Sequence, residues 1–311
     1  MLATGLSCRF VVAIGFAALW SCAQPVANAG SAAPTLAQAR QATYQGLEGA
    51  PDTFAMRDGV WEGAPYMAGG AARPRVVLAE PFHISGDLDG DGQEEAVVLL
   101  SYSGGGSGEF VYFAVLAGKS AGLQNIATVP LGDRVEVVEA AIENGILRAR
   151  LLQAGSSDAA CCPGELVSRA WRLDTQHGLQ RVTVDEAAQR LTLDVLGGYT
   201  WRLRAWAFTE PLLGEVVPTL QVNGDRLVGF AGCNRYFAAA NSGKQAGDLE
   251  IGAVGATRMA CPEPATAVED RFLALLGKVS KFSFLGGQLA LTYIGDDGAG
   301  TMLFERTAAE Q

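Results

Sequence analysis

A nine-residue segment that alternates acidic residues with small ones is where this sequence most clearly offers ligand chemistry. Its positions 1, 3, 5 and 9 carry carboxylates, at Asp87, Asp89, Asp91 and Glu95, and position 6 is a glycine. The backbone carbonyl of Gln93 can add a further oxygen. Alternate carboxylates in a tight loop point their oxygens at one centre, and calcium takes six to eight oxygens at short range. The spacing predicts a structural calcium (Ca2+) site, with an ion-free Asp/Gly-rich turn as the alternative.

The end of this segment differs from an EF-hand. The twelfth residue is Val98 instead of the bidentate glutamate, and the chain has already entered a strand there. The segment instead resembles the shorter calcium loops of FG-GAP-type β-hairpins, in which position 9 closes the site. Because nothing nearby looks like a nucleophile, the expected role of the ion is structural.

Other residue types that support chemistry are scattered. Catalysis by a base would need a nucleophile close to it. His83 lies in a strand before the acidic segment, and His177 lies in a turn beside Gly178. The adjacent Cys161 and Cys162 can pair with each other or elsewhere, whereas zinc needs three or four ligands. We therefore predict no enzyme, and a hydrolase with an unrecognised site is the alternative.

The N-terminus is typical of an exported protein. Residues 1–22 combine one charge, Arg9, with an apolar stretch that is too short to span a bilayer. Leu19-Trp20-Ser21-Cys22 resembles a lipobox, which predicts acylation of Cys22 and a membrane anchor; plain cleavage after Ala29 is the alternative. Residues 23–34 are rich in Ala, Pro, Gly and Ser and read as a flexible tether. The expected location is extracytoplasmic, on the outer membrane or facing the periplasm.

Length and charge limit the remaining choices. The chain has 311 residues, which suits two domains, and a net charge of −10. Nucleic-acid binding would need a clustered positive field, so we predict no nucleic-acid partner. The expected class is α+β. A mostly antiparallel β domain that carries the acidic hairpin loop would span residues 35–184, and an antiparallel sheet packed by one helix would span residues 195–307.

The first domain is expected to consist of strands joined by hairpins. Apolar and β-branched residues dominate residues 75–84, 94–102 and 110–116, and Asn144-Gly145 is a tight-turn signal between two further strands. With the acidic loop, a Gly-rich hairpin and a late Cys161-Cys162-Pro163, this region resembles the N-terminal part of LppP/LprE-like envelope lipoproteins. That resemblance implies an extracytoplasmic β-rich module without an assigned activity.

The second domain contains the clearest helix signal. Val268, Phe272, Leu275 and Leu276 share one face, and Thr266 with Glu269 has the spacing of a capping box. Strands are expected around Asn223-Gly224 and Gly286-Gly287, which are hairpin signals.

Two cysteine-bearing motifs identify this domain with a known family. Gly-Cys-Asn-Arg-Tyr-Phe at residues 232–237, Thr-Arg-Met-Ala-Cys at residues 257–261 and a final Leu-Phe-Glu-Arg strand resemble the META domain, or HslJ-like, family. The resemblance implies a periplasmic or lipoprotein domain linked to heat-shock expression and novobiocin resistance, without catalytic residues. The four cysteines that follow the leader are expected to pair, which allows three connectivities, and we predict Cys233–Cys261.

The residues beside these cysteines mix charge with an aromatic ring. Asn234, Arg235, Tyr236 and Arg258 are predicted surface contacts for an unknown envelope protein or ligand, and local hydrogen bonding that sets the loops is the alternative. The function favoured here is a non-catalytic envelope lipoprotein with a binding or structural role. A protease-inhibitor-like module is a further alternative, because small crosslinked domains often present a rigid loop.

Overall fold

The computed structural model describes residues 32–120, 122–156, 158–159, 162–174, 176–295 and 298–308. The predicted leader, Cys22, tether residues 23–31 and Cys161 lie outside the described residues. All of the described residues belong to one compact unit, Ser31–Gln311. A short helix opens it, α1 (Leu36–Ala39), and the side chain of Thr35 caps its first turn.

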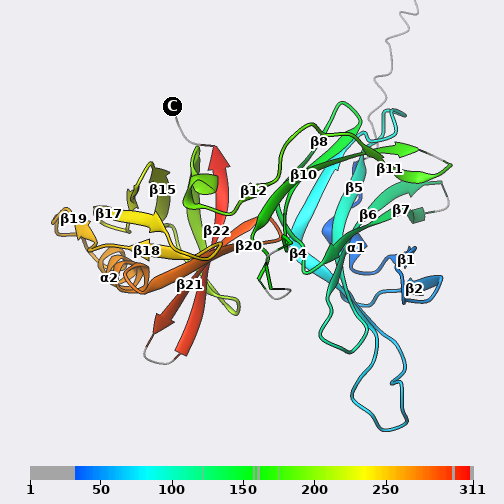
Figure 1. Ribbon diagram of the computed structural model, residues 1–311, viewed down its shortest axis with the longest axis horizontal. Coiled ribbons are helices and arrows are strands. Elements are labelled where there is room, and N and C mark those ends of the chain that lie inside the picture. The colour runs from blue at the N-terminus through cyan, green and yellow to red at the C-terminus, as the bar shows by residue number, and fades with distance from the viewer. Residues whose placement is uncertain are drawn as a thin grey trace, which may run out of the picture. The chain divides into compact units, whose positions relative to one another are not determined.

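The N-terminal module is built from antiparallel strands in two larger sheets (Figure 1). The first sheet has the order β3-β4-β5-β6-β7 and consists of β3 (Val60–Glu62), β4 (Arg75–Gly86), β5 (Glu95–Ser103), β6 (Phe110–Lys119) and β7 (Gly122–Asp133). The second has the order β11-β10-β9-β8 and consists of β8 (Glu136–Glu143), β9 (Ile146–Gln153), β10 (Glu165–Asp174) and β11 (Gly178–Val182). The short β12 (Gln189–Arg190) pairs with β10.

Alternation along these strands explains why the two sheets stack. The faces that meet bury one cluster of apolar side chains, in which Phe113 packs on Phe82 and, edge to face, on Trp171. β8 and β9 are joined at Asn144-Gly145, where both residues have positive φ, 52° and 71°. The hairpin that the Asn-Gly dipeptide predicted is therefore confirmed.

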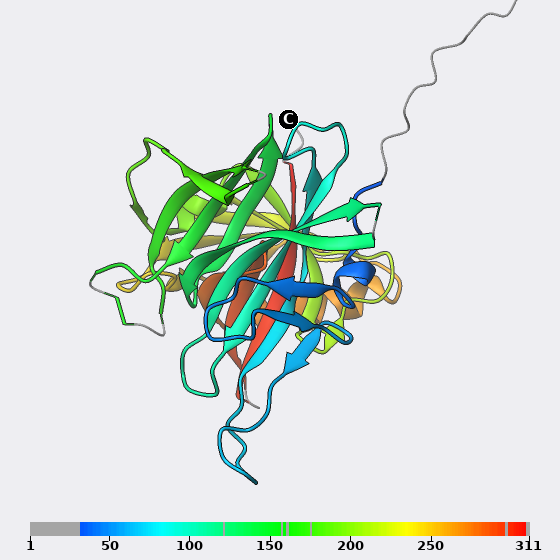
Figure 2. The same ribbon diagram turned by 90° about the vertical axis from the view of Figure 1, so that its right-hand side faces the viewer.

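A third layer covers the outer face of the first sheet. Figure 2 shows α1 and the hairpin of β1 (Thr43–Gln45) and β2 (Thr53–Ala55) lying over its strands. Tyr44, Phe54 and Met56 fill the space between the layers together with Val98 and Leu100 of β5. β5 is consequently buried on both faces, which is why residues 95–100 read as an unbroken apolar run after Glu95.

The C-terminal module is also antiparallel. After the 3₁₀ turn η1 (Leu193–Leu196), its strands lie in the order β18-β17-β16-β15-β13-β22-β21-β20. They are β13 (Tyr199–Ala207), β15 (Thr219–Asn223), β16 (Arg226–Phe230), β17 (Arg235–Ser242), β18 (Leu249–Ile251), β20 (Val279–Leu285), β21 (Gln288–Gly295) and β22 (Gly298–Ala308). The two-residue β14 (Glu210–Pro211) pairs with β13, and β19 (Gly255–Ala256) pairs with β17.

The outermost strands of this order also meet. The backbone N–H of Phe282 in β20 donates to the carbonyl of Gly247 at 2.7 Å, and Asp248 forms a β-bridge with Lys281. The sequence predicted an antiparallel sheet, and the structure adds that the sheet closes on itself. Helix α2 (Ala265–Leu276) contributes Phe272 and Leu276 to the core that the closed sheet encloses.

The two modules share apolar packing. Val138, Leu152 and Leu166 of the second N-terminal sheet lie in the same core cluster as Trp201 and Phe284 of the C-terminal module. The connector belongs to this cluster as well, because Leu191, Leu193, Val195 and Leu196 are all buried. The backbones of the two modules are also hydrogen-bonded to each other. The N–H of Gly287, in the turn between β20 and β21, donates to the carbonyl of Val137 in β8 at 2.8 Å.

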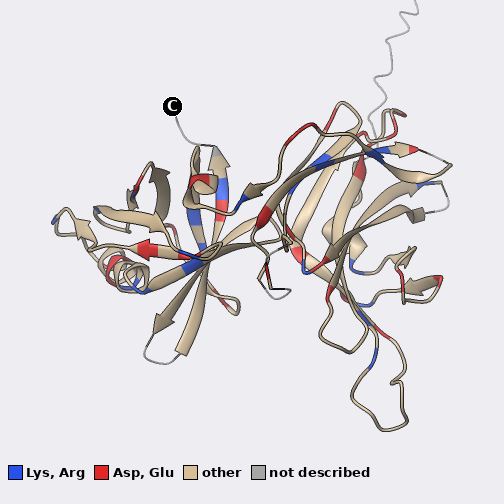
Figure 3. Cartoon of the chain, in the orientation of Figure 1, with Lys and Arg blue, Asp and Glu red and all other residues tan. Residues whose placement is uncertain are grey.

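The chain is therefore mostly antiparallel β structure, with less helix than the α+β expectation implied. Residues of both charge signs are distributed over both modules (Figure 3). Among the described residues, no helix has the length and apolar character needed to cross a membrane.

Candidate functional site

The predicted crosslink forms in the C-terminal module. Cys233 and Cys261 are joined by a disulfide with a Cα–Cα distance of 5.9 Å, inside the range usual for this bond. Cys233 follows β16 and precedes β17, and Cys261 ends the extended segment between β19 and α2. The bond therefore ties a sheet turn to the approach of the helix. Cys162, the second of the two adjacent cysteines in the N-terminal module, is exposed.

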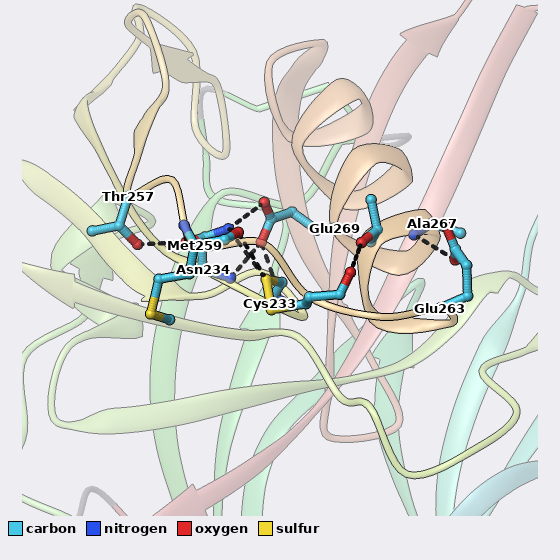
Figure 4. The surroundings of a disulfide bond; sticks show 9 residues. Cys233, Asn234, Thr257, Met259, Glu263, Ala267 and Glu269 are labelled. Carbon is cyan, nitrogen blue, oxygen red and sulfur yellow. Dashed lines mark hydrogen bonds between the residues drawn. A yellow bond between two sulfur atoms is a disulfide. The ribbon is translucent and has the colours of Figure 1, made fainter.

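A half-buried carboxylate organises the turn that carries Cys233 (Figure 4). Glu269, on the first turns of α2, accepts the backbone N–H of Cys233 at 3.1 Å and that of Asn234 through the same oxygen, Oε2. Its other oxygen, Oε1, accepts the Asn234 side-chain amide at 2.9 Å. The half-buried carboxylate thus satisfies three donors.

Asn234 also forms hydrogen bonds with the segment that leads to Cys261. Its Oδ1 accepts the N–H of Met259 at 2.7 Å and the hydroxyl of Thr257 at 2.9 Å, and its Nδ2 donates to the Met259 carbonyl at 3.1 Å. One buried amide therefore holds both backbone groups of Met259 while the Met259 side chain remains 63% exposed. Residues 257–261 are called the disulfide loop from here on. Asn234 holds this loop on its inner side (Figure 4), and residues 257–260 are exposed to solvent.

The glycine before Cys233 is required by this arrangement. Gly232 has a φ of 133°, and a Cβ there would lie 3.1 Å from the Glu269 nitrogen and from a Val268 methyl group. Only a residue without a side chain allows α2 to approach the turn this closely. The Gly-Cys-Asn sequence therefore combines close backbone approach, a crosslink and an amide bridge in three consecutive positions.

Two of the four predicted surface contacts are wrong. Asn234 and Tyr236 are only 3% and 2% exposed. The Tyr236 hydroxyl donates to the Thr219 carbonyl at 3.0 Å, and burial raises the pKa of this phenol. Strand β17 directs Tyr236 inward and Arg235 outward, so only Arg235 and Arg258 of the predicted set are exposed. For Asn234 and Tyr236 the alternative of local hydrogen bonding is correct.

The predicted capping box of α2 is also wrong. The helix begins at Ala265 after Pro264, so Thr266 is already helical, and its hydroxyl donates to the Cys261 carbonyl at 2.8 Å. Glu269 faces the Cys233 turn instead of its own helix start. The Glu269 role was missed because its partner lies 36 residues away in sequence and only tertiary packing brings the two together.

The acidic loop, residues 87–95, joins β4 to β5 in the N-terminal module. Carboxylate oxygens of Asp87, Asp89 and Glu95 lie within 4.8 Å of one another. Asp91 is not part of this group: its Oδ1 accepts the N–H of Gln93 at 2.8 Å, and its Oδ2 lies 3.9 Å from the Lys119 ammonium. Of the five predicted ligands, the structure therefore brings three carboxylates together.

The three carboxylates have different surroundings. Asp87 accepts the N–H groups of Gly90 and Gly92 at 2.7 and 3.1 Å, while Glu95 is 1% exposed and accepts the N–H of Leu88 at 2.9 Å. Burial raises the pKa of the Glu95 carboxyl above its usual range. The negative charges of Asp89 and Asp91 add to this increase. A cation among hard oxygen ligands would offset both effects, so the donor set fits calcium.

The two histidines are held by ordinary structural contacts. The Nε2 of His83 lies 2.7 Å from the Pro34 carbonyl, and the Nδ1 of His177 lies 2.9 Å from Asp174 in an exposed turn. Asp174 also accepts the N–H groups of Gln176 and His177, which lowers the pKa of its carboxyl. Each histidine thus fixes a local segment.

A comparison with models of known protein families gives a match for the C-terminal module. Residues 192–308 match the META domain. A solved structure, the NMR structure of a protein from Burkholderia xenovorans, aligns with 42% of this chain and 99% of its own at 23% sequence identity and a TM-score of 0.30. Among curated proteins, no match is found.

Proposed function

We propose that this chain is a non-catalytic lipoprotein of the bacterial cell envelope whose META domain presents the disulfide loop to a binding partner. It would be exported by residues 1–22 and anchored in the membrane through an acylated Cys22, with residues 35–184 forming an LppP/LprE-like module. The observation that carries the proposal is the pairing of Cys233 with Cys261, because such a bond forms and persists outside the reducing cytosol.

The geometry of the disulfide loop supports a binding role. A loop that is already ordered loses little conformational entropy when a partner binds it. Here the backbone of Met259 is held by Asn234 on both its N–H and its carbonyl, while the side chains of Arg258 and Met259 point to solvent. Exposed cationic and apolar side chains on a fixed backbone are suited to a protein surface that offers an acidic rim around an apolar pocket.

The N-terminal module would serve as a stable spacer. We propose that calcium binds Asp87, Asp89 and Glu95 and fixes the β4–β5 turn, a structural role without chemistry. The closeness of these three carboxylates and the raised pKa of the Glu95 carboxyl support this assignment. A link to envelope stress or antibiotic resistance belongs to the proposal through the META resemblance alone.

The test is a crosslinking pull-down with the native lipoprotein. We expect that replacing both loop side chains, Arg258→Ala with Met259→Ala, removes a partner that the unaltered protein captures. Ile294→Ala is the matched control, because Ile294 is 66% exposed on β21, outside the loop. Equal capture by the loop variant and the control would refute the binding role, and a Cys22→Ala protein that still partitions into detergent would refute the anchor.

A protease-inhibitor-like module is a second candidate, and one observation favours it. An inhibitory loop must stay ordered in a protease cleft, and the side-chain amide of Asn234 braces the backbone of the exposed Met259. Its test is an inhibition assay against endopeptidases that accept Arg or Met at the cleaved bond. Inhibition should be lost in Asn234→Ala and retained in Ile294→Ala; no inhibition by the unaltered protein would eliminate this candidate.

A further inference from the structure

A small cavity lies where the two N-terminal sheets separate at one edge. Its volume is about 290 Å³, and it is bounded by β4, β5, β6 and β8 together with the β20–β21 turn. Most of its wall is aliphatic, with side chains of Leu99, Val111, Val135, Val137 and Leu285. A cavity of this size is at the lower limit for ligand sites, so it suits a ligand of only a few non-hydrogen atoms.

One carboxylate in this cavity has no cationic partner. Glu136 lies at the start of β8 and faces β20, from which the Ser283 hydroxyl donates to its Oε2 at 3.4 Å. Among the described residues, no lysine or arginine forms an ion pair with it. Burial raises the pKa of the Glu136 carboxyl to about 7, since the apolar surroundings disfavour its charge.

The other charged groups around the cavity are already engaged. Arg40 donates to Glu80 through its Nε at 2.7 Å, Ser101 donates to Glu109 at 2.6 Å, and Arg134 pairs with Asp133 at 2.6 Å. Glu109 adds repulsion to Glu136. From β20 and the turn after it, the cavity meets the Ser283 hydroxyl, Leu285 and Gly286, none of which is charged.

We propose that this cavity is a binding site for a small primary alkylammonium ion. The ammonium group would donate to the Glu136 carboxylate and the Ser101–Glu109 pair, and the short carbon chain would pack on Leu99, Val111 and Val137. An ammonium beside a buried carboxylate restores the charge balance that the protein itself leaves open. The site goes beyond the proposed role in partner binding and does not depend on it, because the disulfide loop contributes no residue to it.

The probe for this site is n-butylammonium, added to the mature protein and followed by NMR and calorimetry at about pH 8, where Glu136 is ionised. We expect saturable binding with Kd on the order of 1 mM and shifts confined to residues that line the cavity, on β4, β5, β6, β8 and the β20–β21 turn. Binding should weaken roughly tenfold at about pH 5.5, because Glu136 is then protonated while the amine remains charged. No saturable binding at about pH 8 would overturn the proposal.

Two variants separate the site from general charge effects. Glu136→Gln keeps the shape of the side chain and should weaken binding at least roughly tenfold, whereas Glu165→Gln, a half-buried glutamate of β10 outside the cavity, should leave it unchanged. Leu285→Trp enlarges a side chain that is 41% exposed at the rim and should also weaken binding without touching the carboxylate. Unchanged affinity in Glu136→Gln, or equal binding of butyrate, would contradict the assignment.

Discussion

The acidic loop and the disulfide loop are both polar segments between strands, yet they are held in place differently. At the disulfide loop one half-buried carboxylate, Glu269, accepts three donors, so its oxygens are satisfied within the chain. In the acidic loop three carboxylates lie within 4.8 Å of one another, and their charges repel. The first loop is complete within the chain, whereas the second, in the function proposed above, is completed by a calcium ion from solution.

The two loops should therefore respond differently to chelators and to reductants. A loop held by a covalent bond and internal hydrogen bonds should be insensitive to chelators and sensitive to reductant. A loop held by a bound ion should show the reverse sensitivity, because binding to the folded state alone stabilises that state. These opposite sensitivities distinguish a crosslinked loop from an ion-bound one.

The largest effect should come from Glu269→Ala. It leaves the N–H groups of Cys233 and Asn234 and the Asn234 amide without their acceptor, at roughly 3–5 kcal/mol of unfolding free energy. The measurement is urea unfolding of the mature protein. Glu263→Ala is the matched control, since its carboxylate accepts only an exposed N–H at the start of the same helix. A loss equal to the control would show that the network does not hold the turn.

Removal of the crosslink should cost slightly less. The double variant Cys233→Ser with Cys261→Ser should lose about 3–4 kcal/mol, because a 28-residue separation is no longer closed in the unfolded chain. The same urea series with and without reductant checks this on the unaltered protein. Identical midpoints in both conditions would contradict a stabilising disulfide, and the shift that reductant causes should be the same with and without a chelator.

Calcium should have a smaller effect, confined to the acidic loop. At a concentration one hundred times its Kd, the ion should raise the unfolding free energy by about 2.7 kcal/mol. Thermal unfolding with calcium and with chelator is the measurement, and Asp87→Asn with Asp89→Asn should abolish the difference. If the double variant responds to calcium like the unaltered protein, the ion binds elsewhere.

The smallest effect should be the pH response of Glu95 in chelated protein. Because burial raises its pKa, the folded state binds this proton more tightly than the unfolded chain does. The contribution of Glu95 to stability is therefore greatest at low pH and falls as pH rises through its folded pKa. Stability measured for Glu95→Gln relative to the unaltered protein should rise with pH; a flat difference would contradict the raised pKa.

Part of this molecule could be predicted from local sequence. The Asn144-Gly145 turn, the Thr35 cap and the pairing of the two META cysteines depend on short motifs. The inward direction of Tyr236 was also readable, since Arg235 and Phe237 on either side leave it on the apolar face of a strand. Treating the four polar residues as one surface ignored this alternation.

The remainder depends on contacts between distant residues. Nothing near Glu269 in sequence marks it as the acceptor for the Cys233 turn, and the capping-box spacing pointed to a different role. The buried state of Glu136 arises from packing against Ser283, 147 residues further along the chain. No local pattern predicts that β18 meets β20, because a closed sheet is a property of all its strands together.

The closed sheet of the C-terminal module affects how copies of this protein can associate. With β18 bonded to β20, these strands find hydrogen-bond partners within their own molecule on both sides, so a neighbouring copy is offered little free backbone to extend. Proteins confined to a surface meet one another far more often than they do in bulk solution. On an anchored chain of the kind proposed above, the closed sheet would let neighbouring copies lie side by side without pairing through these strands.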